Sequence, residues 1–331
     1  MTPKQTFTSM LALAGAILAA GLAAPLCAAF AQGAYPEPGK PISVIVAASA
    51  GSGMDVTARL AADALERQLA GTKFQIINRP GAGTQVGIQA TADAKNDGYT
   101  LGVISLPTAV TIPLDPARQA KFDRGSFEPI ANFVYDPGAI AVRAESPHRT
   151  LRDLVDAAKA KPGAITVGAT GPRGREHLDI IAIEGAAGVK FTPVFHNDSG
   201  LALNSLLGGN IDAVQGSVAD FLSQIRAKRV RLLAVFDRQP STFVPDVPTA
   251  ESQGFPIFTG VTRGFAFPDG TPPEAVKRMS EALRQVVESP EQQEKIKTMG
   301  FELRHMDAEE FGRYWDAEVA RIKDLMAKIP N

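Results

Sequence analysis

One unit recurs along most of this chain: a short β-type run, a loop of small polar residues, and a stretch whose apolar residues have helical spacing. Residues 41–47, for example, lead into a Gly-Ser loop and then into an amphipathic pattern through Val56, Leu60 and Leu65. Strands that alternate with helices favour parallel pairing, because a parallel connection needs a long crossover. The repeat therefore predicts an α/β fold built on parallel sheets.

Two extended stretches interrupt this alternation. Residues 127–143 and 258–270 are Gly-bearing β-type runs with no helix between their halves. We interpret them as hinge crossovers, near residues 130 and 260, between two lobes. The predicted first lobe is discontinuous, at residues 35–131 and 264–331, and the predicted second lobe covers residues 132–263.

The first 31 residues have the pattern of a cleavable secretory signal peptide. Lys4 precedes an apolar run at residues 10–26, and Ala29 and Ala31 form an A-x-A cleavage site. The alternative, a transmembrane anchor, is disfavoured because the run is short and lacks a basic flank. Cleavage after Ala31 removes Cys27, the single cysteine, which suits the mature chain to an oxidising compartment. We therefore expect a periplasmic protein.

Charge is nearly balanced, with 34 Lys and Arg against 35 Asp and Glu. A chain without a basic excess is not expected to bind nucleic acid or an acidic membrane surface. Composition does not indicate an oligomer, so a monomer is the expected state.

The loop after the first predicted strand is suited to bind an anion. Gly51, Ser52 and Gly53 open a helix, whose first backbone N–H groups are unpaired and carry partial positive charge. Small residues at this position let an anion approach the amides. Asp55 has the spacing of a capping partner for Ser52, and we favour that role for its side chain because a carboxylate would repel an anion.

A second glycine run, GAGTQVG from Gly81 to Gly87, nearly matches the spacing of a dinucleotide-binding loop. That function needs an Asp or Glu at the end of the next strand, where this chain has Ile104, Ser105 and Leu106. A phosphate-binding P-loop would need a closing Lys, which neither glycine run has. We therefore expect no nucleotide cofactor, and we assign these glycines to contacts made by backbone amides.

Arg263 is the most informative polar residue of the chain. It lies between Thr262 and Gly264 in an otherwise apolar crossover, so it needs a partner, and an anionic ligand is a suitable one. Other candidates lie beyond the carboxyl ends of strands, where α/β proteins bind ligands, although surface or capping roles would also explain them. These candidates are Arg173, His177, His196, Asn197 and Gln215.

Catalytic motifs are scarce in this sequence. The mature chain lacks cysteine and a G-x-S-x-G motif, and its four histidines do not have metal-ligand spacing. We expect a binding protein without a metal, not an enzyme. Two alternatives remain open: a secreted hydrolase that uses His177 or His196 as its base, and a ligand sensor for a membrane signalling protein.

Several motifs, in their order and spacing, resemble the solute-binding receptors of tripartite tricarboxylate transporters, the Bug family. The resemblance runs from YPEPGKPISVIV at Tyr35 through INRPGAGTQVG, DGYTLGV and LLGGNIDA to VPDVPTAESQGFP. It implies a periplasmic-binding-protein fold, a two-lobed Venus flytrap of type II, that closes on a small carboxylate and delivers it to the permease subunits of the transporter. Di- and tricarboxylates, acidic amino acids and aromatic carboxylates all remain open as ligands.

The resemblance also implies positions for the site. In the family, backbone amides and ordered water of the first two loops hold one ligand carboxylate, and other loops set specificity. The matching residues in the first two loops are Ala48, Ser49, Gly51, Ser52, Gly53, Asp55, Gly81, Ala82, Gly83 and Thr84. The matching specificity positions include Ser105, Thr108, Thr170, Gly171, Arg173, His177, His196 and Asn197.

The chain departs from the family pattern at a few positions. Ala47 and Ala48 replace an expected proline, and Ser52 interrupts the usual glycine pair. FHNDSG replaces a Tyr-Lys-Gly type of stretch, and Arg263 replaces an apolar or aromatic residue. These departures predict a ligand with a second anionic or strongly polar end, met by Arg263 and by His196 as a further candidate.

Overall fold

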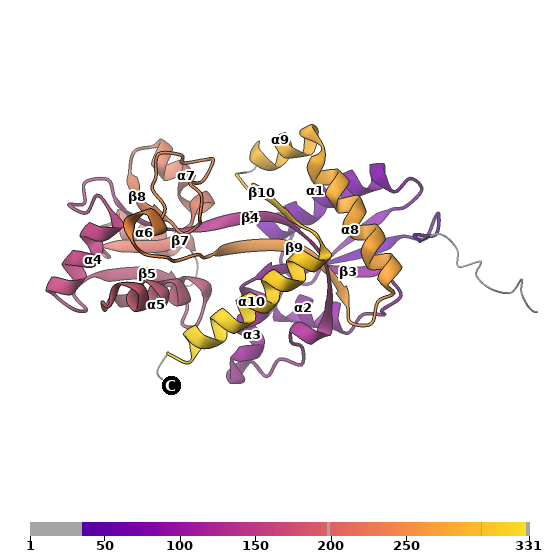
Figure 1. Ribbon diagram of the computed structural model, residues 1–331, viewed down its shortest axis with the longest axis horizontal. Helices are drawn as coiled ribbons and strands as arrows, with labels where there is room; N and C mark the ends of the chain where they lie inside the picture. The colour runs from indigo at the N-terminus through magenta and orange to yellow at the C-terminus, as the bar shows by residue number, and fades with distance from the viewer. Residues whose placement is uncertain (1–34, 197–198, 299, 329–331) are drawn as a thin grey trace, which may run out of the picture. The chain divides into compact units, whose positions relative to one another are not determined.

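A mixed β-sheet is the framework of the protein. The computed structural model describes residues 35–196, 199–298 and 300–328, and within them it contains ten strands (Figure 1). The order along the main path is β2-β1-β3-β9-β4-β7-β5-β6, and β8 and β10 each pair with β4. The strands are β1 (Ile42–Val46), β2 (Phe74–Asn78), β3 (Thr100–Leu106), β4 (Phe127–Arg143), β5 (Thr166–Thr170), β6 (Thr192–His196), β7 (Ala213–Ser217), β8 (Val230–Val235), β9 (Gly260–Pro268) and β10 (Glu302–Met306).

Helices connect and cover these strands. Helices α1 and α2 contact β1, α8 and α10 contact β4, and α5 and α6 contact β5 and β7. The α-helices of the described residues are α1 (Gly53–Gln68), α2 (Gln85–Ala92), α3 (Thr108–Leu114), α4 (Leu151–Ala160), α5 (Arg175–Ala187), α6 (Ser199–Leu207), α7 (Val218–Arg226), α8 (Pro273–Glu288), α9 (Pro290–Thr298) and α10 (Ala308–Met326).

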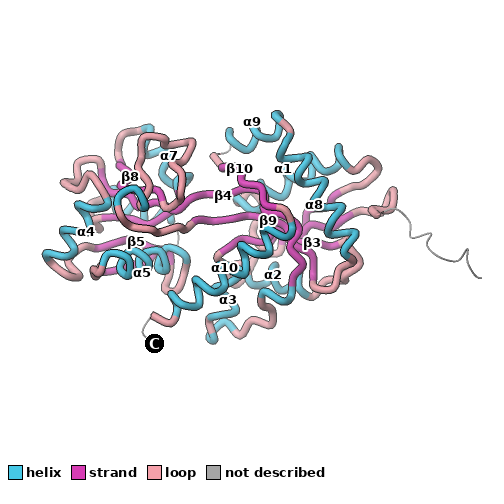
Figure 2. Tube along the Cα trace, in the orientation of Figure 1, coloured by secondary structure: helices cyan, strands magenta, loops and turns pink. Residues whose placement is uncertain are grey.

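The two predicted crossovers are the strands β4 and β9, which run side by side (Figure 2). Strand β4 pairs with β9 and β10 near its beginning and with β7 and β8 near its end, and all four pairings are antiparallel. Parallel pairing is found between β1 and its neighbours β2 and β3, and between β5 and its neighbours β6 and β7. The predicted parallel pairing is therefore found on both sides of the crossovers, and each antiparallel pairing of the described strands involves β4 or β9.

The buried side chains of β4 alternate between the two faces of the sheet. Ile140 and Val142 belong to a core cluster with residues of α4 and α5. Ala139 and Ala141 belong to a second cluster with residues of α6 and α7. This alternation follows from the two-residue period of a strand, and it lets one strand anchor helices on both sides.

Aromatic packing covers the beginning of β4. The side chain of Trp315 in α10 is fully buried and stacks on Phe127, with ring centroids 5.5 Å apart. Phe311, one turn earlier in α10, packs against the same indole ring. Burying aromatic side chains of this size contributes strongly to stability, so α10 is held firmly on the sheet.

Local signals explain several helix starts. Thr150 and Asp153 form a capping box at α4, and Asp307 and Glu310 form another at α10. The sequence did not predict α3, a seven-residue helix that contains Pro113. Its shortness and its internal proline remove the periodic pattern by which helices are recognised.

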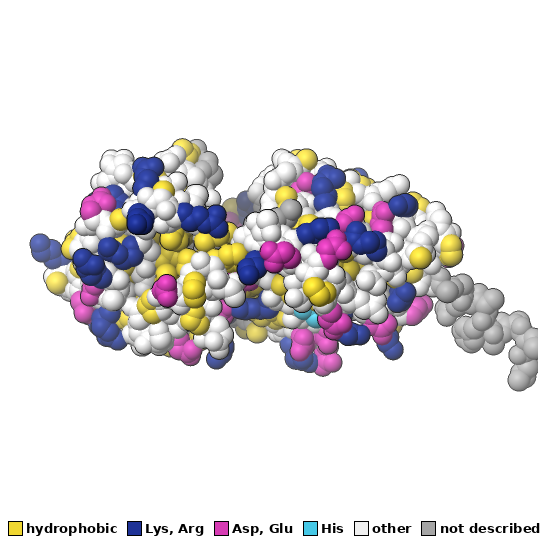
Figure 3. All heavy atoms as spheres, turned by 90° about the horizontal axis from the view of Figure 1, so that it is seen from above, with side chains coloured by type: hydrophobic (Ala, Val, Ile, Leu, Met, Phe, Trp, Pro, Cys, Tyr) yellow, Lys and Arg dark blue, Asp and Glu magenta, His cyan; other side chains and the backbone are white. Residues whose placement is uncertain are grey.

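The predicted signal peptide and Asn197 lie outside the described residues, and the predicted lobe boundaries remain a prediction. From Pro38 onward the chain forms one compact unit. Within the described ranges, no helix is long and apolar enough to cross a membrane. The face drawn in Figure 3 carries Lys and Arg side chains interspersed with Asp and Glu.

Candidate ligand-binding site

A charged cavity of about 510 Å³ lies beside β4 and β9, where α3 faces the N-terminal ends of α5 and α7. Its volume is in the range that holds a small ligand. Charged side chains of both signs line it. The arginines are Arg118, Arg173, Arg175 and Arg263, and the carboxylates are Asp115, Asp136, Glu176 and Asp220.

A second hollow, of about 810 Å³, lies on α4, α5 and β6. Although it is larger, its lining is mainly apolar, with Lys159, His177, Glu184 and Lys190 among its polar residues. The smaller cavity brings together groups from α3, β4, α5, α7 and β9. We take it as the candidate site because convergent polar groups mark ligand sites better than volume does.

Arg263 lies in β9, opposite Ser105 of β3 and Val134 of β4. Its guanidinium lies 4.8 Å from the ring centroid of Phe301, and a Cβ built on Gly53 would be 3.3 Å from Nη2. The Nη1 atom is buried and has no hydrogen-bond partner among the described residues. Burial lowers the pKa of Arg263, although Asp136 and Asp220 oppose that shift.

The neighbourhood of Gly53 explains why an anion would be favourable there. Gly53 is the first residue of α1, so the Arg263 guanidinium lies beside the positive end of a helix. Asp55, in the first turn of α1, already offsets part of the positive charge of this helix end, so Arg263 is the main positive group that an anion would meet. The geometry thus suits a carboxylate held by Arg263 and by backbone N–H groups.

Asp136 and Asp220 are the carboxylates whose charges act on Arg263. Asp136, in β4, is 5% exposed, and its Oδ1 accepts a 3.3 Å hydrogen bond from the backbone N–H of Ala219. Burial raises the pKa of Asp136 to about 7, while Arg263 opposes the shift and Asp220 adds to it. Asp220 is exposed, and its Oδ2 accepts a 2.8 Å hydrogen bond from the backbone N–H of Ser217.

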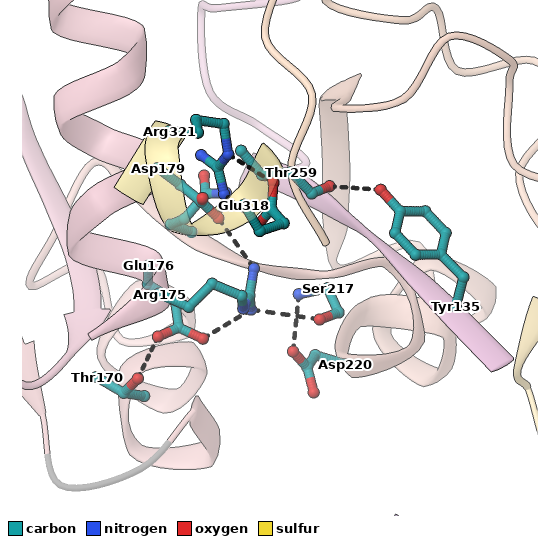
Figure 4. Close-up of polar contacts among 11 residues, drawn as sticks. Tyr135, Thr170, Arg175, Glu176, Asp179, Ser217, Asp220, Thr259, Glu318 and Arg321 are labelled. Atoms are coloured by element: carbon teal, nitrogen blue, oxygen red, sulfur yellow. Dashed lines mark hydrogen bonds and ion pairs between the residues drawn. The ribbon is translucent and has the colours of Figure 1, made fainter. Parts of the chain in front are cut away.

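Arg175 is the centre of a network at the start of α5 (Figure 4). It forms ion pairs with Glu176 at 2.7 Å and Asp179 at 3.0 Å, and Nη2 donates to the Ser217 hydroxyl at 3.3 Å. The two carboxylates raise the pKa of Arg175, outweighing the opposite effect of burial. Because its charge is already compensated, Arg175 supports the cavity wall and is less available to a ligand than Arg263.

The loop before α5 contacts the opposite side of the cavity. Arg173 Nη1 lies 3.3 Å from Asp115 Oδ1, and the Arg173 backbone N–H donates to Nδ1 of His177 at 3.0 Å. A Cβ on Gly174 would be 2.5 Å from the carbonyl oxygen of Thr170, so only glycine fits the sharp turn there. The ion pair therefore connects the loop of α5 to the segment after α3.

The first glycine loop is held by its own side chains. Ser52 Oγ accepts from the backbone N–H of Asp55 at 3.3 Å, and Asp55 Oδ2 accepts from the backbone N–H of Gly51 at 2.9 Å. Arg59 and Asn78 donate to the same carboxylate. The hydrogen bond from Arg59 is the main cause that lowers the pKa of Asp55 to about 2. Ser52 thus caps α1, while the Asp55 side chain holds the loop through Gly51, Arg59 and Asn78; the backbone N–H of Ser52 donates to Ser49 and not to Asp55.

The second glycine loop has an unusual backbone. Gly81, Ala82, Gly83 and Thr84 all have positive φ, which is uncommon for Ala and Thr. The Arg118 side chain stabilises this turn by hydrogen bonds to the Ala82 carbonyl and to Oε1 of Gln85. Gly83 and Arg118 both line the cavity, so the side chain that stabilises this turn also forms part of the cavity wall.

The family model described as tripartite tricarboxylate transporter family receptor (TctC) matches residues 57–330. The chain belongs to this family. BugT of Bordetella pertussis is 31% identical to it over 289 residues, which cover 85% of each chain. The predicted family is thereby confirmed.

Solved structures support the same assignment for this TctC-family protein. A TctC solute-binding protein from Polaromonas, solved without ligand, is 30% identical, with a TM-score of 0.79 over 89% of this chain and 100% of its own. Two Rhodopseudomonas palustris proteins, MatC with malate and another with adipate, are each 23% identical. Their TM-scores are 0.70 and 0.73, and they cover 87% and 88% of this chain and 99% and 97% of their own. The fold of periplasmic solute-binding proteins, a Venus flytrap, is confirmed.

The structure brings part of the predicted site of this TctC-family protein into the cavity lining. Gly83, Thr108, Thr170, Arg173 and Arg263 line it. The remaining described candidates are not among its lining residues, and their contact with ligand stays a prediction. They are Ala48, Ser49, Gly51, Ser52, Gly53, Asp55, Gly81, Ala82, Thr84, Ser105, Gly171, His177, His196 and Gln215.

Three of these residues have protein partners that account for them. His177 accepts from Arg173 and packs edge-on against Phe195, with centroids 5.0 Å apart. Nδ1 of His196 lies 3.0 Å from the Val194 carbonyl oxygen. Gln215 is buried and donates to Asp179 at 3.0 Å. These three side chains thus contact other groups of the protein, and none of them lines the cavity.

Several cavity residues of the TctC-family protein were missed from the sequence. Asp136 could have been found from the sequence, because it is a charged residue within an apolar crossover. The same pattern singled out Arg263. Arg175 lies only two residues beyond the candidate Arg173, in the first turn of α5. Asp115 and Arg118 follow the unpredicted helix α3, and no local pattern of the sequence marks them.

Proposed function

We propose that this protein is a periplasmic receptor that captures a small carboxylate at Arg263 and delivers it to the permease of a tripartite tricarboxylate transporter. The observation that carries the proposal is the buried Nη1 of Arg263, which has no described hydrogen-bond partner and belongs to a guanidinium beside the start of α1. A buried cation without a hydrogen-bond partner is costly, and a bound carboxylate removes that cost.

Two further lines support a carboxylate ligand. Proteins with the same fold have been solved with malate and with adipate. The signal-peptide pattern of residues 1–31 places the chain where such receptors meet their ligands. Closure around the ligand would bend β4 and β9, the strands that flank the cavity.

Binding is tested with mature protein that has been unfolded, stripped of ligand and refolded. A thermal-shift panel would include malate, adipate, citrate, benzoate, aspartate and glutamate. A ligand at 100 times its Kd adds about 2.7 kcal/mol to the free energy of unfolding, which raises the melting temperature by several degrees. A panel in which no carboxylate raises the melting temperature contradicts the proposal.

The role of Arg263 is tested by Arg263→Ala, with Arg284→Ala as the matched control on an exposed helix surface. Removing a charge-assisted hydrogen bond should weaken binding by about 1.5 to 3 kcal/mol, or roughly 10- to 150-fold in Kd. The control should leave Kd unchanged in isothermal titration calorimetry. Equal affinity of Arg263→Ala and the parent protein would remove Arg263 from the site.

Delivery to a permease is tested in cells. A strain that lacks the receptor should lose uptake of the radiolabelled ligand found by calorimetry, and the parent gene should restore it. Uptake that continues at the parent rate in the deletion strain contradicts the transport role while leaving ligand binding intact.

A further inference from the structure

The charges that line the cavity do not all remain available to a ligand. Arg175 is paired with Glu176 and Asp179, and Arg173 is paired with Asp115. Arg118 is turned to the second glycine loop, where it donates to Ala82 and Gln85. The groups left for a ligand are one guanidinium, Arg263, and two carboxylates, Asp136 and Asp220.

The two carboxylates are only partly compensated by the protein, because Arg263 and Arg175 act on Asp136 without forming an ion pair with it. Neither Asp136 nor Asp220 forms an ion pair within the described part of the chain, and each accepts one backbone hydrogen bond, from Ala219 and Ser217 respectively. Asp136 is 5% exposed, so its unpaired charge is costly. This wall of the cavity, from β4 and α7, therefore favours a positive group.

Arg263 is the diagonal cross-strand neighbour of Asp136, because Arg263 lies opposite Val134 and Asp136 lies opposite Val261, and Asp220 lines the same cavity. Asp136 and Asp220 are the acidic groups that oppose the lowered pKa of Arg263, and Arg263 is the main cation acting on Asp136. A ligand bound here therefore meets a positive and a negative wall a short distance apart.

This arrangement discriminates between two kinds of carboxylate ligand. A dicarboxylate would place a second negative charge beside two carboxylates that have no counter-ion, one of them buried. A ligand with a carboxylate and a neighbouring ammonium would offer each wall the opposite charge. On the basis of the proposed function, we propose that the ligand is an α-amino acid, with its carboxylate on Arg263 and its ammonium on Asp136 and Asp220.

The test compares ligand pairs that differ in the amino group alone or in its replacement by hydroxyl. Calorimetry on refolded protein at pH 7.5 would measure Kd for aspartate against malate and for 2-aminoadipate against adipate, extended to the other amino acids and their deaminated counterparts. The amino member of the best-binding pair should bind about tenfold more tightly or better.

Asp220→Asn assigns that preference to a residue. It keeps an oxygen to accept from Ser217, so folding, checked by melting temperature, should be preserved. The variant should weaken the amino ligand about tenfold or more and leave the deaminated ligand unchanged or tighter. Asp136→Asn should do the same, and Asp246→Asn, on an exposed surface residue, should change neither Kd.

Each outcome decides the inference. If deaminated carboxylates bind as tightly as the amino acids, the inference is overturned while the proposed function stands. If Asp220→Asn and Asp136→Asn fold but weaken both members of a pair equally, an ammonium contact is refuted. If no member of any pair binds, the inference is overturned, and the proposed function fails with it when citrate and benzoate also leave the melting temperature unchanged.

Discussion

Replacing Asp136 by asparagine should change how the stability of the ligand-free protein depends on pH. Burial raises the pKa of Asp136 from 3.8 to about 7. Between these values the folded state holds a proton that the unfolded state has released, so the free energy of unfolding falls as pH rises through this window. Above pH 7 the folded protein bears the full cost of a buried, ionised carboxylate.

The magnitude follows from the two pKa values. A shift of about three pK units at 1.36 kcal/mol each corresponds to about 4 kcal/mol at pH 8. Some of that cost is already present at pH 4.5, since the unfolded carboxyl is largely ionised there. The stability of Asp136→Asn relative to the parent protein should therefore rise by about 3 kcal/mol between pH 4.5 and pH 8.

Urea unfolding followed by the fluorescence of Trp315, the single tryptophan, measures this difference at each pH. Other buried acids, such as Asp179, are present in both proteins, so their titration cancels in the comparison. Asp246→Asn, on an exposed residue, should give a difference near zero at every pH. If the difference in free energy of unfolding between Asp136→Asn and the parent protein stays constant from pH 4.5 to pH 8, the reasoning is refuted.

Two further predictions concern the support of the site. Arg175→Met should lower the free energy of unfolding by about 3 to 5 kcal/mol in urea titrations. The substitution leaves two buried carboxylates, Glu176 and Asp179, without their cation. A loss under 1 kcal/mol would contradict this prediction. Gly87→Ala should cost about 1 to 3 kcal/mol, because its Cβ would lie 2.4 Å from Cα of Ala47 and push α2 off β1. The matched control, Gly185→Ala, meets nothing within 4 Å in α5 and should stabilise by about 0.5 to 1 kcal/mol. Equal effects of the two glycine substitutions on the urea midpoint would argue against the steric explanation.

Much of the fold is encoded in local patterns of the sequence. Residues 127–143 and 258–270 were predicted as extended runs, and the structure has β4 over the first and β9 (Gly260–Pro268) within the second. Period-two and helical spacing report which face of an element is buried, and capping residues such as Thr150 mark its ends. These signals arise within a few residues, so they can be read without knowledge of the tertiary structure.

The site depends on contacts that no local pattern encodes. Strand β9 brings Arg263 beside Val134 of β4, and α7 places the backbone of Ala219 on Asp136. Which strands pair, and in which direction, is decided by packing across more than a hundred residues of sequence. The sequence by itself therefore determined the α/β fold and the receptor family, and it singled out a lone arginine whose predicted partner is an anion. Only the tertiary structure decided that Asp136 and Asp220 line the same cavity as that arginine, because the effect of a charge depends on its distance and burial.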